Sequence, residues 1–235
     1  MTAAEYEYEG DELTLFQNAK NWKRYWSSQV RPYLGKRVLE VGAGLGSNTA
    51  YLNGGAEEWV CLEPDKEMSA ALADRQRANE LPATRVISGT IADLPARPSF
   101  DSIVYIDVLE HIGDDASEIA AAAARLFPNG TLVALSPAHQ WLFSPFDAAI
   151  GHCRRYSPAS LRALTCPELE LVVLRQLDSV GILASAVNRF LLRPKMPTVS
   201  QILAWDRFMV PVSRLMDPLL FYSLGKSIVA VWRRR

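Results

Sequence analysis

The segment Glu40-Val41-Gly42-Ala43-Gly44-Leu45-Gly46-Ser47-Asn48 carries the most informative pattern in the sequence. It follows an apolar run, 37–41, that is typical of a buried strand, and it leads into a helical pattern over 48–53. Glycines at such a strand-to-helix turn let the backbone approach a ligand that a Cβ atom would exclude. We therefore expect a small-molecule ligand to bind at this turn.

Strand and helix patterns alternate along the rest of the chain. Further strands are expected at 59–63, 85–88, 100–107, 131–136, 170–177 and 227–232, and helices at 12–33, 65–79, 114–127 and 158–164. This alternation predicts an α/β fold, namely a Rossmann-like, doubly wound, mostly parallel seven-stranded sheet with helices on both faces. Sheets of this kind bind ligands at the carboxyl ends of their strands, where the strand order reverses.

Composition narrows the class of protein. The 235 residues are 49% hydrophobic and 22% charged, as in an ordinary globular domain, and the net charge of −1 lacks the basic excess of a general nucleic-acid binder. The three cysteines form no disulfide framework, no cluster of side chains has metal-ligand spacing, and the acidic first residues are unlike a signal peptide. Charged residues interrupt the apolar stretches, so we predict no membrane span and expect a cytoplasmic protein.

Glu40 distinguishes between two classes of nucleotide cofactor. The loop spacing is GxGxG, whereas dinucleotide-binding loops favour GxGxxG. A carboxylate two residues before the first glycine would repel a pyrophosphate, but it can accept a hydrogen bond from an ammonium group. S-adenosylmethionine has such an ammonium group and no phosphate, so we predict that it is the cofactor. A nicotinamide-dependent oxidoreductase is one alternative, and a non-catalytic module that keeps the cofactor-binding fold is another.

Later strand ends supply further candidate contacts to the cofactor. Glu63 ends the second strand, where a carboxylate can accept hydrogen bonds from both ribose hydroxyls; its alternative role is capping of the next helix. The turn holding Thr90 and Ile91 can present a backbone N–H and an apolar side chain to an adenine ring. Asp107 and His111 follow the fourth strand near the same crevice, and we expect His111 to pack against the cofactor.

The ordered set of motifs resembles the class I S-adenosylmethionine-dependent methyltransferases, most closely the small-molecule branch typified by ubiquinone-biosynthesis O-methyltransferases. The resemblance covers residues 38–136 well and extends more loosely to 164. It implies that the methionine part of the cofactor lies against Glu40, Gly42, Gly44 and Gly46, and Asn48, at the end of the loop, is a further candidate contact to the cofactor. It also implies that Glu63 holds the ribose. The family commonly has Gly-Asp at the turn after the third strand, but this chain has Gly89-Thr90, so Thr90 or Ile91 is expected to make that contact.

The methyl acceptor is expected beside the long segment that follows the fifth strand. This segment is irregular and rich in aromatics, which favours a functional loop over disorder, and it carries two of the three histidines. His152 is the first candidate for a general base, because the pKa of imidazole lies near neutrality, and His139 is the second. A structural histidine bonded to a backbone carbonyl is the alternative for His152. Candidates for binding the acceptor are Trp22, Tyr25, Trp141, Arg154, Arg155 and Tyr156.

Two adjacent arginines in this segment have two possible roles. Arg154 and Arg155 can hold an anionic acceptor, such as a carboxylate or a phosphate. Ion pairing with Asp147 or with the acidic segment 5–12 is the alternative for the same two side chains.

We expect a single methyltransferase domain over 1–235. Its parts are an N-terminal helical cap (1–35), a cofactor-binding core (36–136), an acceptor-side loop and helix (137–165) and a helical insertion or lid (181–225) before the last strand. Within the insertion, apolar residues recur at helical spacing from Ile202 to Leu219, and Pro211 is expected to kink or divide that helix. The first interpretation is a lid packed on the core; the alternatives are a dimer face and a pocket for a hydrophobic acceptor.

The sequence therefore predicts a methyltransferase that uses S-adenosylmethionine and releases S-adenosylhomocysteine. The acceptor is a small molecule methylated on oxygen or nitrogen, and no metal ion takes part. We expect a monomer or a homodimer, no nucleic-acid partner, and at most a peripheral membrane contact made with a hydrophobic acceptor.

Overall fold

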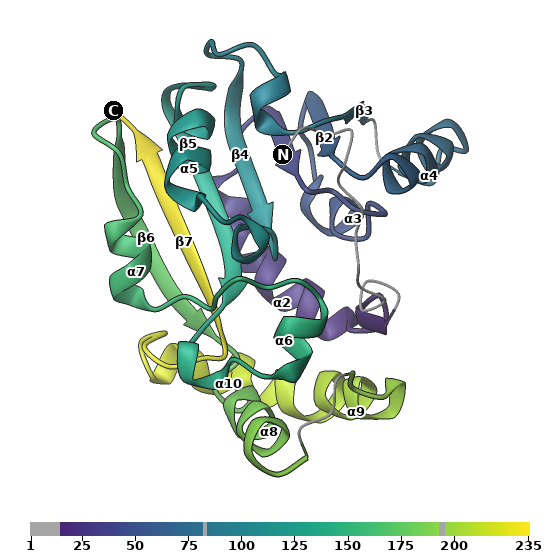
Figure 1. Cartoon of the computed structure of the whole chain (residues 1–235), viewed down its shortest axis with the longest axis vertical. Helices are drawn as coiled ribbons and strands as arrows, with labels where there is room; N and C mark the ends of the chain where they lie inside the picture. The colour runs from purple at the N-terminus through teal and green to yellow at the C-terminus, as the bar shows by residue number, and fades with distance from the viewer. Residues whose placement is uncertain (1–14, 82–83, 193–195) are drawn as a thin grey trace.

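The structure, a computed structural model, describes residues 15–81, 84–192 and 196–235 (Figure 1). Its centre is a seven-stranded sheet in the order β3-β2-β1-β4-β5-β7-β6. The strands are β1 (Arg37–Val41), β2 (Glu58–Glu63), β3 (Arg85–Ser88), β4 (Phe100–Ile106), β5 (Leu126–Pro137), β6 (Leu169–Leu177) and β7 (Ser227–Arg234). Only β7 pairs antiparallel with its neighbours, so the predicted mostly parallel Rossmann-like sheet is confirmed. The strand order reverses between β1 and β4, which places a ligand crevice at their carboxyl ends.

Helices surround this sheet at both faces. They are α2 (Lys20–Val30), α3 (Thr49–Leu52), α4 (Lys66–Arg77), α5 (Asp115–Ala123), α6 (Pro145–Ala149), α7 (Pro158–Ala163), α8 (Gly181–Val187), α9 (Val199–Ala204) and α10 (Val210–Leu219). Helix α4 begins at Asp65, whose side chain accepts a hydrogen bond from the backbone N–H of Met68 at 2.9 Å. Such an N-cap satisfies one of the free donors at a helix start.

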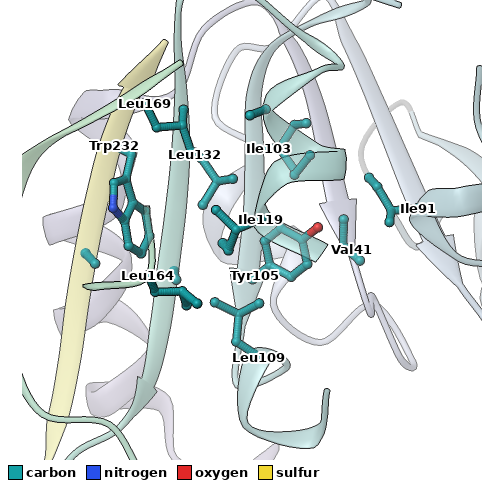
Figure 2. Close-up of a cluster of buried hydrophobic side chains, with 14 of the residues drawn as sticks. Val41, Ile91, Ile103, Tyr105, Leu109, Ile119, Leu132, Leu164, Leu169 and Trp232 are labelled. Atoms are coloured by element: carbon teal, nitrogen blue, oxygen red, sulfur yellow. The ribbon is translucent and has the colours of Figure 1, made fainter. Parts of the chain in front are cut away.

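Two apolar cores lie on opposite faces of the sheet, because side chains alternate along each strand. Leu39 and Val41 of β1 point into the core covered by α5 and α7, part of which is drawn in Figure 2. Val38 points into the other core, which is covered by α2 and by the insertion between β6 and β7. Glu40, the next residue along, lies on the same face as Val38 and is buried. This alternation fixes where its carboxylate goes.

The helix predicted at 12–33 is interrupted. Residues 12–14 lie outside the described part, residues 17–19 leave the helical conformation, and α2 starts at Lys20. The cause is a cap supplied from far along the chain: Asp206 accepts hydrogen bonds from the backbone N–H groups of Asn21 at 3.1 Å and Trp22 at 2.8 Å. The local apolar spacing gave no sign of this contact, so the predicted single helix was wrong.

The helix predicted at 114–127 also ends early. Helix α5 stops at Ala123, and β5 already pairs with β4 at Leu126. The segment Pro128-Asn129-Gly130 forms an irregularity within β5, where the register shifts and Asn129 adopts a φ of 65°. A Cβ atom at Gly130 would lie 3.0 Å from the carbonyl oxygen of Asp101, so the close strand approach needs glycine there.

The segment after β5 is more regular than predicted. It contains a 3-10 turn (Gln140–Leu142) and the short helix α6. Ser144 and Asp147 form a capping box at the start of α6, and Pro145 occupies its first turn. The sequence carried this signal, but the abundance of aromatic residues around it favoured an irregular loop.

The insertion forms a helical layer beside α2. Helix α9 continues through a π-helical turn (Trp205–Met209) into α10, and Pro211 lies in the first turn of α10. Another π-helical turn (Asn188–Leu192) follows α8. Among the described helices, none has the length and apolar character needed to cross a bilayer.

Candidate functional site

A cavity of about 600 Å³ lies at the carboxyl ends of β1, β2 and β4. The glycine loop, Glu63 and the turn after β3 line one part of it. Side chains that follow β4, together with α6 and His152, line the other part. The cavity therefore joins the predicted cofactor side to the predicted acceptor side.

The glycine loop is held in a conformation that needs glycine. Gly42, Gly44 and Gly46 have φ angles of 67°, 54° and 73°, in the left-handed region. At Gly42 a Cβ atom would lie 2.6 Å from Cγ2 of Val108, and at Gly46 it would lie 2.6 Å from Cδ1 of Leu72. Gly42 and Gly44 line the cavity together with Asn48, whereas Gly46 packs on α4 and is not among the lining residues.

Glu63 is fixed by the backbone around it. Its Oε2 atom accepts a hydrogen bond from the N–H of Gly44 at 2.7 Å, and its Oε1 atom accepts one from the N–H of Asp65 at 3.0 Å. The side chain is buried but lines the cavity. Burial raises the pKa of Glu63, and the two backbone N–H donors oppose that rise. Each carboxylate oxygen keeps a second lone pair that a ligand hydroxyl can use.

Glu40 lies beneath the cavity and is not among its lining residues. Its Oε2 atom accepts hydrogen bonds from the Thr49 hydroxyl at 2.7 Å and the Trp59 indole N–H at 2.9 Å. Burial raises the pKa of Glu40 to about 7, and the hydrogen bonds from Thr49 and Trp59 oppose this rise. The side chain thus ties α3 to β2, and its predicted contact to the cofactor stays a prediction.

The turn after β3 is a rigid part of the wall. Thr90 and Ile91 both line the cavity. The hydroxyl and the backbone N–H of Thr90 donate to Oδ2 of Asp93 at 2.9 and 2.8 Å, so Asp93 holds the turn from the solvent side. The Thr90 hydroxyl is therefore engaged, which leaves Ile91 as the better-placed apolar contact for a ring.

Asp107 stands where β4 ends, with a φ of 55°, and lines the cavity. The Asp107 side chain is open to the cavity; the protein packed around it raises the pKa of its carboxyl to about 6, while interactions with His152, Lys226 and Lys23 oppose that rise. Lys23 comes from α2 and also lines the cavity, and burial lowers its pKa to about 8. The sequence analysis did not single out this lysine, because it lies on a helix far from the motifs.

Two imidazole rings meet on the acceptor side. The ring centroids of His111 and His152 are 4.6 Å apart in an edge-to-face arrangement, and both residues line the cavity. Burial lowers the pKa of His111 to about 4. The Nδ1 atom of His152 lies 3.0 Å from Oδ1 of Asp147. That partner is a carboxylate, so the alternative of a bond to a backbone carbonyl was wrong for this nitrogen.

Asp147 organises this side of the cavity. The Nε and Nη2 atoms of Arg155 donate to its two oxygens at 2.8 and 2.9 Å, and the Ser144 hydroxyl donates at 2.8 Å. Burial alone would raise the pKa of Asp147, but the hydrogen bonds from His152, Arg155 and Ser144 outweigh it and hold the pKa below its ordinary value. The predicted ion pair of Arg155 with Asp147 is confirmed, so this guanidinium is already neutralised.

Glu110 is a site residue that the sequence analysis did not assign. Its side chain is fully buried and lines the cavity, and neither carboxylate oxygen has a hydrogen-bond partner among the described residues. Burial raises the pKa of Glu110 well above its usual value, and the charge of Asp107 adds to the rise. Its Oε1 atom lies 3.9 Å from Nε2 of His152. An acidic side chain four residues after a buried strand was the available signal in the sequence.

The other predicted residues lie in different places. Trp22 lines the cavity, whereas Tyr25 donates its hydroxyl to Asp217 at 2.7 Å and is not among the lining residues. Trp141 is half exposed and stacks on Phe190. The three remaining candidates are also outside the lining of the cavity: His139, Arg154 and Tyr156.

Two of these side chains, Arg154 and Tyr156, have a partner in Asp115. Arg154 forms an ion pair with Asp115 at 2.5 Å. The Tyr156 hydroxyl also donates to Asp115, at 2.7 Å. Burial lowers the pKa of His139. The roles of Tyr25, Trp141, His139, Arg154 and Tyr156 therefore stay predictions.

Comparison with known proteins supports this description of the fold. Residues 39–134 match a family described as "Methyltransferase domain". The matched residues are therefore similar to a methyltransferase domain, and the sheet order agrees with a Rossmann-like fold. The resemblance to the ubiquinone-biosynthesis branch is not confirmed. A comparison with curated protein sequences finds no match.

Solved structures share the fold at low sequence identity. A putative methyltransferase from Bacillus halodurans C-125 is 15% identical with a TM-score of 0.60, the match covering 89% of this chain and 97% of that chain. The N-methyltransferase NodS from Bradyrhizobium japonicum WM9 is 15% identical with a TM-score of 0.57, covering 92% and 96%. Coclaurine N-methyltransferase, solved with N-methylheliamine and S-adenosylhomocysteine (SAH), is 13% identical with a TM-score of 0.60, covering 92% and 72%.

Proposed function

We propose that this protein transfers a methyl group from S-adenosylmethionine to an oxygen or nitrogen atom of a small, largely apolar molecule. The observation that carries the proposal is the single cavity, which has the glycine loop and Glu63 in one part and His111, His152 and Glu110 in the other. A cofactor and an acceptor held in these two parts would meet beside His152.

The chain's own groups fit the cofactor. The loop of Gly42 and Gly44 forms a cradle that side chains would fill, and Glu63 offers fixed acceptor oxygens for two ribose hydroxyls. Because Glu40 is not on the cavity wall, we assign the ammonium contact to Asp107 and to the loop backbone. When bound, S-adenosylmethionine supplies an electrophilic sulfonium methyl group.

The wall of the acceptor side favours an apolar molecule. Phe16, Trp26, Phe146 and Ile150 line the cavity. Arg155 is paired with Asp147, and Arg154 is paired with Asp115 outside the lining, so neither arginine is poised as a clamp for an anion. An aromatic or aliphatic molecule with a hydroxyl or amine group suits this wall better than a phosphate or carboxylate.

His152 is the base in this proposal. If its Nδ1–H donates to Asp147, its Nε2 atom carries the free lone pair and points toward the side of the cavity where Glu110 lies. Asp147 would then fix the tautomer and stabilise the imidazolium that forms as the proton leaves the acceptor. Closure of the apolar wall around the acceptor would keep water from the reacting atoms.

Calorimetric titration with SAH and with NADH tests the cofactor assignment first. We expect the protein to bind SAH and not NADH. Binding of NADH alone would favour the oxidoreductase. Binding of SAH without turnover, across a panel of apolar phenols and amines that also bind, would favour a non-catalytic module.

A further inference from the structure

The insertion between β6 and β7 exposes an unusual number of large apolar side chains. Helices α8, α9 and α10 gather at the end of the molecule opposite α4 (Figure 1). We call the exposed side chains of this layer the insertion surface; its most exposed members are Leu183 at 66%, Phe208 at 65%, Leu215 at 73%, Leu219 at 71% and Phe221 at 89% of their full accessible area. Contiguous exposed apolar patches on a protein usually mark a contact with something else.

The apolar exposure follows a stripe along the helix rather than scattered positions. Val199, Leu203, Phe208, Val212, Leu215 and Leu219 are all exposed, at intervals of three to five residues. The five-residue interval spans the π-helical turn (Trp205–Met209), which adds one residue to that turn of the helix. The opposite face carries Ile202, Trp205 and Val210, which are buried in the core. The helix is therefore apolar on two faces, and core packing explains only one of them.

In the insertion, the acidic side chains are buried, whereas two arginines are exposed. Residues 181–225 contain two acidic residues, and both are buried and used internally. Asp206 caps α2, while Asp217 accepts hydrogen bonds from the backbone N–H groups of Asp178 at 2.7 Å and Ser179 at 3.0 Å. Arg207 and Arg214 lie exposed beside the apolar stripe. The insertion surface thus offers apolar and positively charged groups and, among its described residues, no exposed carboxylate.

We propose that the insertion surface docks on an anionic lipid bilayer. An interfacial helix of this kind buries its apolar face at the boundary between headgroups and acyl chains, while arginines beside that face contact anionic headgroups. A second copy of the chain fits less well, because each copy would bring the same positive charges to the contact. The docking does not depend on the proposed function.

The position of the surface suggests what docking accomplishes. Trp205, on the inner face of the same helix, contacts Phe16 with ring centroids 6.2 Å apart and Trp22 with ring centroids 5.8 Å apart. Both of those residues line the cavity. Docking would therefore hold this part of the cavity close to the bilayer, where an apolar acceptor concentrates; this consequence, unlike the docking itself, rests on the proposed function.

Flotation with vesicles tests the proposal. The full-length protein is mixed with vesicles of phosphatidylcholine alone or of phosphatidylcholine with phosphatidylglycerol, at low and at high salt. We expect binding to the vesicles that contain phosphatidylglycerol, weakened by salt because screening reduces the attraction of the arginines to the headgroups. Absence of binding, or equal binding to both vesicle types, overturns the proposal.

Matched variants assign the binding to the insertion surface. Arg207→Gln with Arg214→Gln should weaken partition onto the anionic vesicles roughly 30-fold at low salt. Leu215→Gln with Leu219→Gln should weaken it at both salt concentrations. The control, Arg77→Gln with Arg97→Gln, removes two exposed charges from elsewhere and should leave binding nearly unchanged. Undiminished binding by both test variants overturns the proposal, provided that their thermal unfolding matches the wild type.

Sedimentation velocity tests the alternative occupant of the insertion surface, a second copy of the chain. We expect the sedimentation profile to show no dimer whose formation requires Leu215 and Leu219. A dimer that Leu215→Gln with Leu219→Gln abolishes, in a protein that does not bind vesicles, would assign the surface to self-association instead.

Discussion

The Nδ1 atom of His152 lies 3.0 Å from Oδ1 of Asp147, and both residues line the cavity. Arg155 and Ser144 hold the same carboxylate, so its position does not depend on a ligand. The pair is thus preorganised, with the second ring nitrogen turned toward the cavity side that holds Glu110. A base placed in this way needs little rearrangement when an acceptor binds.

Replacing this imidazole should separate chemistry from cofactor binding. We expect His152→Ala to lower turnover by ~10²–10⁴-fold, because the acceptor loses its proton acceptor. The affinity for SAH should stay near the wild-type value. Turnover is measured with whichever apolar phenol or amine yields SAH, and affinity is measured by calorimetry.

His139→Ala is the matched control for that change. His139 is also a histidine of the segment after β5, but it is not among the residues that line the cavity. Its removal should change turnover much less than His152→Ala does. Wild-type turnover by His152→Ala would mean that the pocket acts by orienting an acceptor that is already nucleophilic.

Glu63→Ala should weaken binding of SAH at least tenfold. The change removes fixed acceptors for the ribose hydroxyls, and hydrogen bonds to a charged group are each worth roughly 1.5–3 kcal/mol. It also frees the N–H groups of Gly44 and Asp65. Binding of adenine alone, measured by the same calorimetry, should fall much less. Equal losses for the two ligands would indicate a damaged fold rather than a lost ribose contact.

Two glycines of the loop form a matched pair for testing the cradle. Gly44 lines the cavity, whereas Gly46 packs on α4, and both have a positive φ. Gly44→Val and Gly46→Val should therefore both lower the free energy of unfolding, by about 1–3 kcal/mol. Only Gly44→Val should also weaken binding of SAH at least tenfold, at a temperature where both variants are folded. Similar affinities for the two variants would argue against a backbone cradle at Gly44.

The sheet and the cofactor side could be predicted because their signals are local. Strand periodicity and the glycine turn act over a few residues, and Glu63 follows its strand directly, so the sequence alone brings them together at one edge. The position of Glu40 shows where that reasoning stops. Its spacing from the glycines suggested a ligand contact, which stays a prediction, but the spacing did not reveal that strand alternation turns the side chain toward the α2 face, where Trp59 donates a hydrogen bond to it.

The features that were missed depend on how the chain folds, and one of them is a contact between residues distant in sequence. Asp206 caps α2 at Trp22, which is 184 residues away, and no local pattern reveals such a pair. The contact between Asp147 and His152 was missed for another reason: the two residues are only five apart, but the sequence analysis considered Asp147 only as a partner for the arginines. Glu110 could not be assigned from the sequence, because an acidic residue after a strand is common. It becomes unusual only because the fold buries it away from solvent.

Burial of Glu40 should leave a pH signature in stability. Its pKa is raised from 4.5 to about 7 in the folded protein, chiefly by burial. Between these two values the folded chain keeps a proton that the unfolded chain has released. The contribution of Glu40 to the free energy of unfolding therefore falls as the pH rises from about 4.5 to about 7, and it is level above that. The full change is on the order of 3 kcal/mol.

Glu40→Gln removes this titration while keeping a side-chain oxygen that can accept from Thr49 or Trp59. The free energy of unfolding of the variant, minus that of the wild type, should therefore increase as the pH rises from about 4.5 to about 7 and then level off. Urea unfolding at a series of pH values measures this difference, which cancels the titration of Asp107 and Glu110 because both proteins carry them. Glu67→Gln, at an exposed position on α4, serves as the control and should show a much smaller trend. A difference for Glu40→Gln that stays constant across this pH range would mean that the buried carboxylate remains charged, held by Thr49, Trp59 and the nearby charge of Lys23.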